Sequence, residues 1–193
     1  MAEIILFHHA QGLTEGITAF ADALRAAGHE VTVPDMYDGH TFETLEEGLE
    51  YADEVGFGTV IKRGQDAVED APGEVVYIGF SLGVMPAQAL AQTRAGARGA
   101  VFFHSCVPPT EFADEWPAGL PVQVHAMEDD ELFVEEGDLD AARELVKVAG
   151  AELFLYDGED HLFADSSLEE YDEEAAALAL ERVLAFLATL DAR

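Results

Sequence analysis

Short apolar runs alternate along the chain with longer segments in which apolar residues recur at helical spacing. The runs are typical of β-strands and cover residues 3–9, 30–37, 75–80, 99–105, 120–127 and 152–158. Unbroken runs such as EIILFHH indicate strands that are buried on both faces. The helical patterns cover residues 14–27, 58–71, 83–95, 136–149 and 169–190.

This order of elements predicts the fold class. Repeated β-then-α units favour right-handed crossovers and an α/β fold, a doubly wound, mostly parallel sheet with helices on both faces. Such sheets bind ligands at the C-terminal ends of their strands, so chemistry is expected there. Residues 38–57 are the least sheet-like part of the chain. We interpret them as a helix-containing excursion over the same edge, placed to shape a substrate pocket.

Length and the lack of targeting signals narrow the class further. A chain of 193 residues can form one core, so we expect a single domain over residues 1–193. The first residues carry no basic segment before an apolar run, and no apolar stretch reaches the roughly 20 residues of a membrane helix. We therefore expect a cytoplasmic protein without a membrane partner, as a monomer or small homo-oligomer.

Charge excludes two classes of partner. Nine Lys and Arg residues against forty Asp and Glu residues give a formal net charge of −31. Such a surface repels phosphates, so nucleic acids and anionic membranes are not expected partners. The acidity has two open interpretations, a generally solvated acidic surface or adaptation to high salt. The single cysteine, Cys106, precludes an intramolecular disulfide and is expected to be a small buried side chain rather than a nucleophile.

The most specific motif is the segment GFSLG, from Gly79 to Gly83. It follows the apolar run VVYI directly and precedes a helical pattern, as expected for a nucleophile on a tight strand-to-helix turn. Glycines on either side allow the close backbone approach that this turn requires. Ser81 is therefore the candidate nucleophile, and the backbone N–H of Leu82 is a candidate donor to an oxyanion.

A serine nucleophile needs a base and an acid, which in this architecture follow it in the order acid, then histidine. His161 lies in a loop after the last strand run, whereas His125 falls inside a strand and His104 is a poorer candidate. The acid is expected after the fifth strand, in MEDDELF. Spacing from the strand end favours Asp130, with Asp129 as the alternative.

The loop after the first strand, HHAQG, is expected to supply a second oxyanion donor. A backbone N–H at Ala10 or Gln11 fits this role. His8 and His9 do not indicate a metal site, because adjacent side chains diverge on a strand and no ligand spacing accompanies them. No metal and no other cofactor is expected.

The whole chain resembles the dienelactone hydrolase family, a compact, lidless branch of the α/β-hydrolase fold. The resemblance rests on FHHAQGLTEG, VPDMYDG, GFSLG, VHAMEDDELF and LYDGEDHLFAD. It implies the same nucleophile, acid and base: Ser81, Asp130 and His161.

The chain departs from the family pattern at two positions. The founding members of the family carry a cysteine where this chain has Ser81. They also have a substrate-binding arginine four residues after the catalytic histidine, where this chain has Asp165. An acidic residue there is expected to repel an anionic dienelactone. Arg63 is the one arginine that we can place loosely near the site.

These observations predict a serine hydrolase that cleaves a small ester, lactone or thioester through an acyl-enzyme. Peptidase or amidase activity on the same fold is an alternative, and so is a non-catalytic binding protein. A nucleotide-binding protein is disfavoured because GFSLG matches neither the dinucleotide-binding nor the Walker pattern.

Overall fold

Six parallel strands form one sheet in the computed structural model, which describes residues 1–71 and 73–192. The order across the sheet is β2-β1-β3-β4-β5-β6, and every neighbouring pair is parallel. The strands are β1 (Glu3–Phe7), β2 (Glu30–Thr32), β3 (Val75–Phe80), β4 (Ala97–Phe103), β5 (Val122–Met127) and β6 (Glu152–Tyr156).

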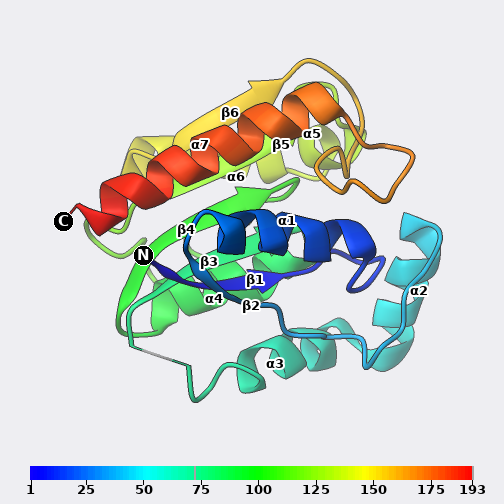
Figure 1. Cartoon of the computed structure of the whole chain (residues 1–193), viewed down its shortest axis with the longest axis horizontal. Helices are drawn as coiled ribbons and strands as arrows, with labels where there is room; N and C mark the ends of the chain where they lie inside the picture. Colours follow the sequence, from blue (N-terminus) through cyan, green and yellow to red (C-terminus); the bar gives the residue numbers. More distant parts are fainter. Residues whose placement is uncertain (72, 193) are drawn as a thin grey trace.

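Helices cover both faces of this sheet, so the predicted doubly wound architecture is confirmed (Figure 1). Two of them, α1 (Glu15–Ala26) and α7 (Glu173–Asp191), bury apolar residues against one face. The other core cluster contains residues of α2 (Leu45–Val55), α3 (Phe57–Asp66), α4 (Val84–Thr93), α5 (Glu131–Glu135) and α6 (Asp138–Ala149). None of the described helices is both long and apolar enough to span a bilayer.

Local sequence explains where α1 begins and ends. The side chain of Thr14 accepts a hydrogen bond from the Ile17 backbone N–H, which caps the first turn. At the other end Gly28 has φ of 95°, and His29 N–H bonds back to the carbonyl of Leu24. This left-handed turn stops the helix and favours glycine.

Four of the six strands are shorter than the apolar runs predict, whereas β3 has its predicted bounds and β4 has its predicted length but begins two residues earlier. The run over residues 30–37 contains only the three-residue β2, an edge strand that pairs solely with β1 and is followed closely by Pro34. His8, His9, His104 and Ser105 lie just beyond their strands instead of inside them. Apolar runs continue past the last paired residue because the strand ends remain buried.

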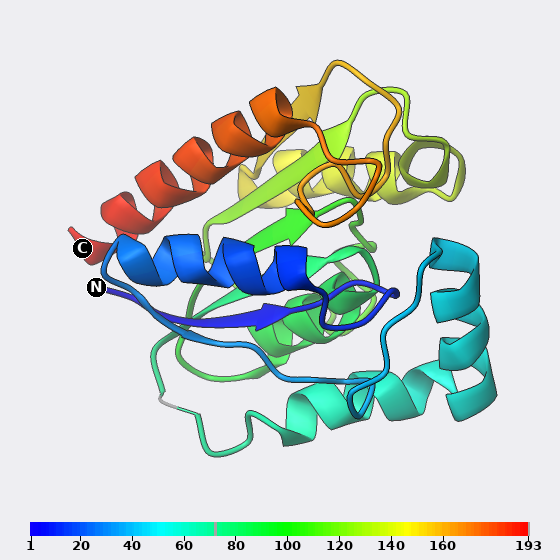
Figure 2. The ribbon, with the colours of Figure 1, turned by 45° about the vertical axis from the view of Figure 1, so that its right-hand side comes forward.

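The excursion over residues 38–57 contains a helix, as predicted. This helix, α2, lies at the C-terminal end of the sheet, near the loop that follows β6 (Figure 2). The strand order turns back between β1 and β3, which makes a topological switch point at that end. Parallel sheets of this kind bind ligands at such a point.

Candidate active site

Ser81 lies at the switch point, on a tight turn between β3 and α4. Its φ is 49°, a left-handed conformation that is rare for a residue other than glycine. A short 3-10 helix over Ser81–Gly83 leads directly into α4. A side chain at Gly83 would place Cβ 2.4 Å from the carbonyl oxygen of Phe7, so only glycine lets this turn approach β1. The strained backbone therefore projects Ser81 above the sheet edge.

Three side chains from distant parts of the chain meet at this turn. Ser81 Oγ lies 2.8 Å from His161 Nε2. On the other side of the same ring, His161 Nδ1 lies 2.7 Å from Asp130 Oδ2. The side chain of His161 is 14% exposed, whereas that of Asp130 is only 2% exposed. The structure thus brings together Ser81, His161 and Asp130 in a continuous chain of hydrogen bonds.

Asp130 is fixed by the start of α5. Its Oδ1 accepts hydrogen bonds from the backbone N–H groups of Leu132 and Phe133, at 3.1 and 3.4 Å. This N-cap leaves Oδ2 free to face the imidazole. The alternative acid, Asp129, is exposed at the surface. Of the four consecutive acidic side chains in the loop, the structure turns Asp130 towards His161.

The other candidate nucleophile and bases are buried and do not belong to this chain of hydrogen bonds. Cys106 is buried, and burial raises the pKa of its thiol. His125 lies inside β5, where burial and, less strongly, Arg182 lower its pKa to about 3. His104 lies next to the site, with its ring centroid 5.6 Å from that of His161. Burial lowers the pKa of His104 well below its usual value, so its ring is neutral.

The two backbone donors expected in the loop after β1 are not equivalent. The Gln11 N–H donates to His9 Nδ1 at 3.2 Å, so it is already engaged. Ala10 N–H makes no hydrogen bond within the part of the chain that the structure describes. Leu82 follows Ser81 in the 3-10 turn and lines the same pocket. The arrangement favours Leu82 and Ala10 over Gln11 as an oxyanion pair.

A cavity of about 260 Å³ opens at Ser81 and His161. Its apolar lining consists of Leu45, Leu49, Leu82, Met85, Val107 and Leu132. Its polar lining consists of Ser81, His104, Ser105, Glu136, Asp138 and His161. Larger hollows of about 520 and 670 Å³ lie elsewhere, but neither is lined by Ser81 or His161. The cavity at Ser81 is therefore the one in which this chemistry can act.

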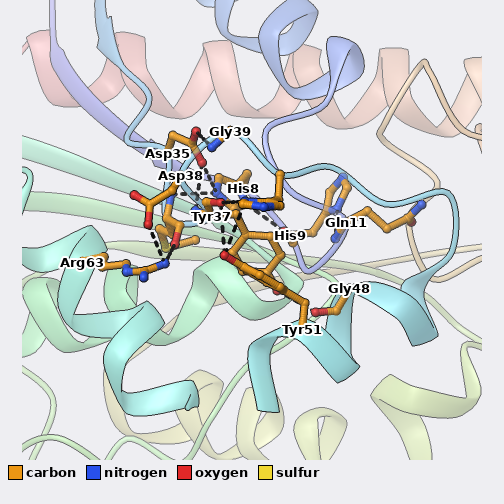
Figure 3. A network of polar contacts seen from close by, with 12 residues as sticks. His8, His9, Gln11, Asp35, Tyr37, Asp38, Gly39, Gly48, Tyr51 and Arg63 are labelled. Atoms are coloured by element: carbon orange, nitrogen blue, oxygen red, sulfur yellow. Dashed lines mark hydrogen bonds and ion pairs between the residues drawn. The ribbon is translucent and has the colours of Figure 1, made fainter. Parts of the chain in front are cut away.

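The α2 wall of the cavity is tied to the end of β1 by a network of polar contacts (Figure 3). Tyr37 Oη donates to the Gly48 carbonyl at 3.0 Å, inside α2. His8 Nε2 accepts from the Met36 backbone N–H at 3.0 Å, and burial lowers the pKa of His8 to about 4. A neutral His8 can therefore accept this bond at neutral pH. These contacts hold the excursion over the sheet edge, as the sequence predicts.

Neither of the two charged residues singled out from the sequence, Arg63 and Asp165, lines the cavity. Arg63 does not line the cavity, because its guanidinium pairs with Asp38 at 3.1 Å and donates to the Met36 carbonyl (Figure 3). Asp165 is fully buried and does not line the cavity either. Its Oδ2 lies 2.7 Å from His9 Nε2, so this carboxylate cannot repel a substrate by direct contact.

The sequence reasoning missed the acidic wall of the cavity. Glu136 and Asp138 line it, although the pattern predicted only a helix beginning near residue 136. No motif marks these residues as functional. The missed signal was their position in the segment after the fifth strand, close to Asp130, where α5 ends and α6 begins. Among the described residues, no group of three or more histidine, cysteine or acidic side chains is arranged to hold a metal ion.

Comparisons with known proteins agree with this architecture. The profile of the dienelactone hydrolase family matches residues 1–190. One similar solved structure is a dienelactone hydrolase-like promiscuous phosphotriesterase from metagenomic libraries, with a TM-score of 0.77 and 22% identity over 98% of this chain and 87% of that one. No curated protein matches the chain in a sequence search.

Two further structures share the fold. A protein assigned as a dienelactone hydrolase from Klebsiella pneumoniae aligns with a TM-score of 0.72 and 19% identity, over 97% of this chain and 87% of that chain. Esterase PE8 aligns with a TM-score of 0.67 and 16% identity, over 98% of this chain and 92% of that chain. At these identities the structures establish the α/β-hydrolase fold, while the profile match covers nearly the whole sequence. The chain belongs to the dienelactone hydrolase family, a family of hydrolases built on this fold.

Proposed function

We propose that this protein is a serine hydrolase that cleaves a small ester, lactone or thioester through an acyl-enzyme intermediate. The observation that carries the proposal is the hydrogen-bonded chain from Ser81 Oγ through both nitrogens of His161 to Asp130 Oδ2. Family membership supports the hydrolase class. The acyl-enzyme route rests on the geometry of these three side chains.

The chain of hydrogen bonds supports one tautomer of His161. An ionised carboxylate only accepts, so Asp130 favours the tautomer in which His161 Nδ1 carries the proton. Nε2 then has a free lone pair facing Ser81 Oγ. His161 can take the serine proton as Oγ attacks the substrate carbonyl. The backbone N–H groups of Leu82 and Ala10 are the proposed donors to the oxyanion.

The remaining steps use the same groups. His161 returns the proton to the leaving group as the carbonyl–leaving group bond breaks, which leaves the acyl group on Ser81. Water then attacks the acyl-enzyme, with His161 accepting its proton, and the serine is released. No further cofactor is needed for this sequence of steps. We infer a single catalytic domain over residues 1–193, acting in the cytoplasm as a monomer or small homo-oligomer.

The first prediction tests the nucleophile. A fluorophosphonate probe should label Ser81, and Ser81→Ala should abolish both labelling and ester turnover, because a serine triad without its nucleophile cannot form the acyl-enzyme. Intact-mass and peptide mass spectrometry locate the label. Cys106→Ser is the control and should retain activity, since this thiol is buried and has a raised pKa.

Three outcomes distinguish the alternatives. Labelling at Ser81 with turnover of amides in preference to esters would favour a peptidase or amidase. A folded protein that neither reacts with the probe nor turns over any ester would favour a non-catalytic binding protein. Full ester turnover in the Ser81→Ala variant would rule out the proposed nucleophile.

A further inference from the structure

The cavity beside Ser81 has an uncompensated negative wall. Asp138, the first residue of α6, and Glu136, at the C-terminal end of α5, line it. No Lys or Arg occurs among its described lining residues. Arg143, five residues after Asp138 in α6, pairs with Asp140 at 3.5 Å instead. Within the described residues, no cationic side chain therefore pairs with the carboxylates of this wall.

Asp138 has a free oxygen available for a ligand. Its Oδ1 accepts hydrogen bonds from Ser105 Oγ at 2.5 Å and from the Cys106 N–H at 2.8 Å, which fix the orientation of the side chain. Its Oδ2 makes no hydrogen bond within the described part of the chain. The side chain is half-buried, and burial, as the largest influence, raises the pKa of its carboxyl. A cationic ligand would offset this cost of holding a charge away from water.

A second polar group of the same cavity also lacks a partner. His104 lines the cavity, is 1% exposed, and neither of its ring nitrogens has a hydrogen bond within the described residues. Its φ of 66° is strained for a residue with a side chain. The unpaired ring nitrogens point to a polar ligand at this wall, because buried polar groups in proteins are normally paired. The neutral ring contributes no positive charge that would offset the two carboxylates.

We propose that the cavity selects esters or lactones that carry a cationic group, held by Asp138 and Glu136 beside an otherwise apolar chain. The apolar side of the cavity, with Leu45, Leu49 and Met85, suits the hydrocarbon part of such a substrate. This inference rests on the proposed serine hydrolase activity and adds the charge of the substrate to it. At short range a half-buried carboxylate is screened far less than the surface charges.

The test compares cationic esters with uncharged isosteres of the same shape. The first pair is butyrylcholine, whose charge lies on the alcohol part, and the uncharged ester in which a tert-butyl group replaces the trimethylammonium group. The second pair carries the charge on the acyl part. It compares a nitrophenyl hexanoate with a trimethylammonium group at the far end of its acyl chain and the same ester with a tert-butyl group there. The measured quantity is the ratio of kcat/KM for the cation to kcat/KM for its isostere, at low and at moderate salt.

We expect at least one pair to show a ratio of about 10 that survives moderate salt, because the Debye length is then only about 8–10 Å and the field of distant charges is screened. Asp138→Asn should lower this ratio about tenfold, and Glu136→Gln should lower it by a smaller factor. Asp140→Asn is the matched control. It lies on the same helix and removes the same charge, but its carboxylate is 88% exposed and does not line the cavity.

The outcomes separate this inference from the proposed function. A ratio near 1 for both pairs in moderate salt, in an enzyme that still hydrolyses the neutral isosteres through Ser81, would overturn the cationic substrate class alone. An equal fall of the ratio in Asp138→Asn and Asp140→Asn would overturn it as well. If Asp138→Asn fails to fold, the wild-type ratio in salt and the Glu136→Gln variant decide the question.

Discussion

At the scale of single residues, one carboxylate in an acidic loop is distinguished from its neighbours by local geometry. Asp130 caps α5 with one oxygen and faces His161 Nδ1 with the other, at 2.7 Å. Asp129, its neighbour, is exposed. The spacing argument from the strand end favours the same residue, but only the helix cap explains why its side chain turns inward.

The prediction is that Asp130→Asn reduces kcat by a factor on the order of 10⁴, because the amide favours the wrong tautomer of the base. Asp129→Asn changes the net charge equally and should alter kcat only a few-fold. Steady-state kinetics on a neutral ester provide the measurement. A reversal of the two results would keep the serine and histidine but assign the acid to Asp129.

Asp165 is a second buried carboxylate, and its contacts indicate a structural role. It accepts hydrogen bonds from Thr14 and Ser167 and lies 2.7 Å from His9 Nε2. Burial alone would raise its pKa, but the hydrogen bonds from His9, Ser167 and Thr14 lower it. The folded state therefore favours the ionised form, which adds stability above the unfolded pKa of about 3.9. This contribution is lost as the pH falls through the lower folded pKa.

Replacing Asp165 with Asn should therefore lower the free energy of unfolding at neutral pH by about 1–3 kcal/mol, because buried donors lose their ionised acceptor. The difference in unfolding free energy from wild type should narrow as the pH falls from about 4 through the lower folded pKa of Asp165, because the carboxyl is protonated first in the unfolded state. Urea unfolding at several pH values measures both quantities. Asp157→Asn, at an exposed position, is the control. A gap that is independent of pH would contradict the assigned role.

At the scale of elements, the turn that carries Ser81 depends on how closely the start of α4 approaches the end of β1. A Cβ at Gly83 would lie 2.4 Å from the Phe7 carbonyl oxygen and 2.6 Å from that of His8. Backbone atoms cannot move aside as a flexible side chain can. The glycine is thus required by packing between elements as well as by the turn itself.

Gly83→Ala should destabilise the protein by about 1–3 kcal/mol, the usual cost of overpacking, and should reduce kcat because Ser81 moves away from His161. Gly58→Ala is the matched control in α3. That glycine is exposed, and a Cβ there meets nothing within 4 Å, so alanine should stabilise the helix by about 0.5–1 kcal/mol. Chemical denaturation and ester kinetics test both variants. Similar effects at the two sites would contradict the packing argument.

At the scale of the whole molecule, the net charge of −31 acts on every charged substrate. A strongly acidic protein lowers the local concentration of anions and slows their encounter with the site. Salt weakens this effect, because the Debye length falls from about 30 Å at 0.01 M to about 10 Å at 0.1 M. This long-range effect does not require contact between the substrate and Asp165, which is buried.

We therefore expect kcat/KM for a neutral ester to exceed that for its carboxylated analogue, with a gap that narrows as salt is added. The measurement compares the two substrates over a range of sodium chloride concentrations. Because the anion should gain from screening, its kcat/KM should rise with salt while that of the neutral ester stays nearly constant. A preference for the anion at low salt would instead require a basic pocket that the described lining does not contain.

The sequence by itself determines the fold class, the helix-containing excursion and the candidate nucleophile. These follow from local patterns, since alternating runs and helical spacing specify elements, and the glycines around Ser81 specify a turn. Strand ends were predicted less well, as in β2, because pairing with a neighbour decides where a strand stops. Only the tertiary structure turns Asp130 towards His161 and buries Asp165 against His9. It alone brings Asp138 to the cavity wall, because contacts between distant segments depend on how the elements pack.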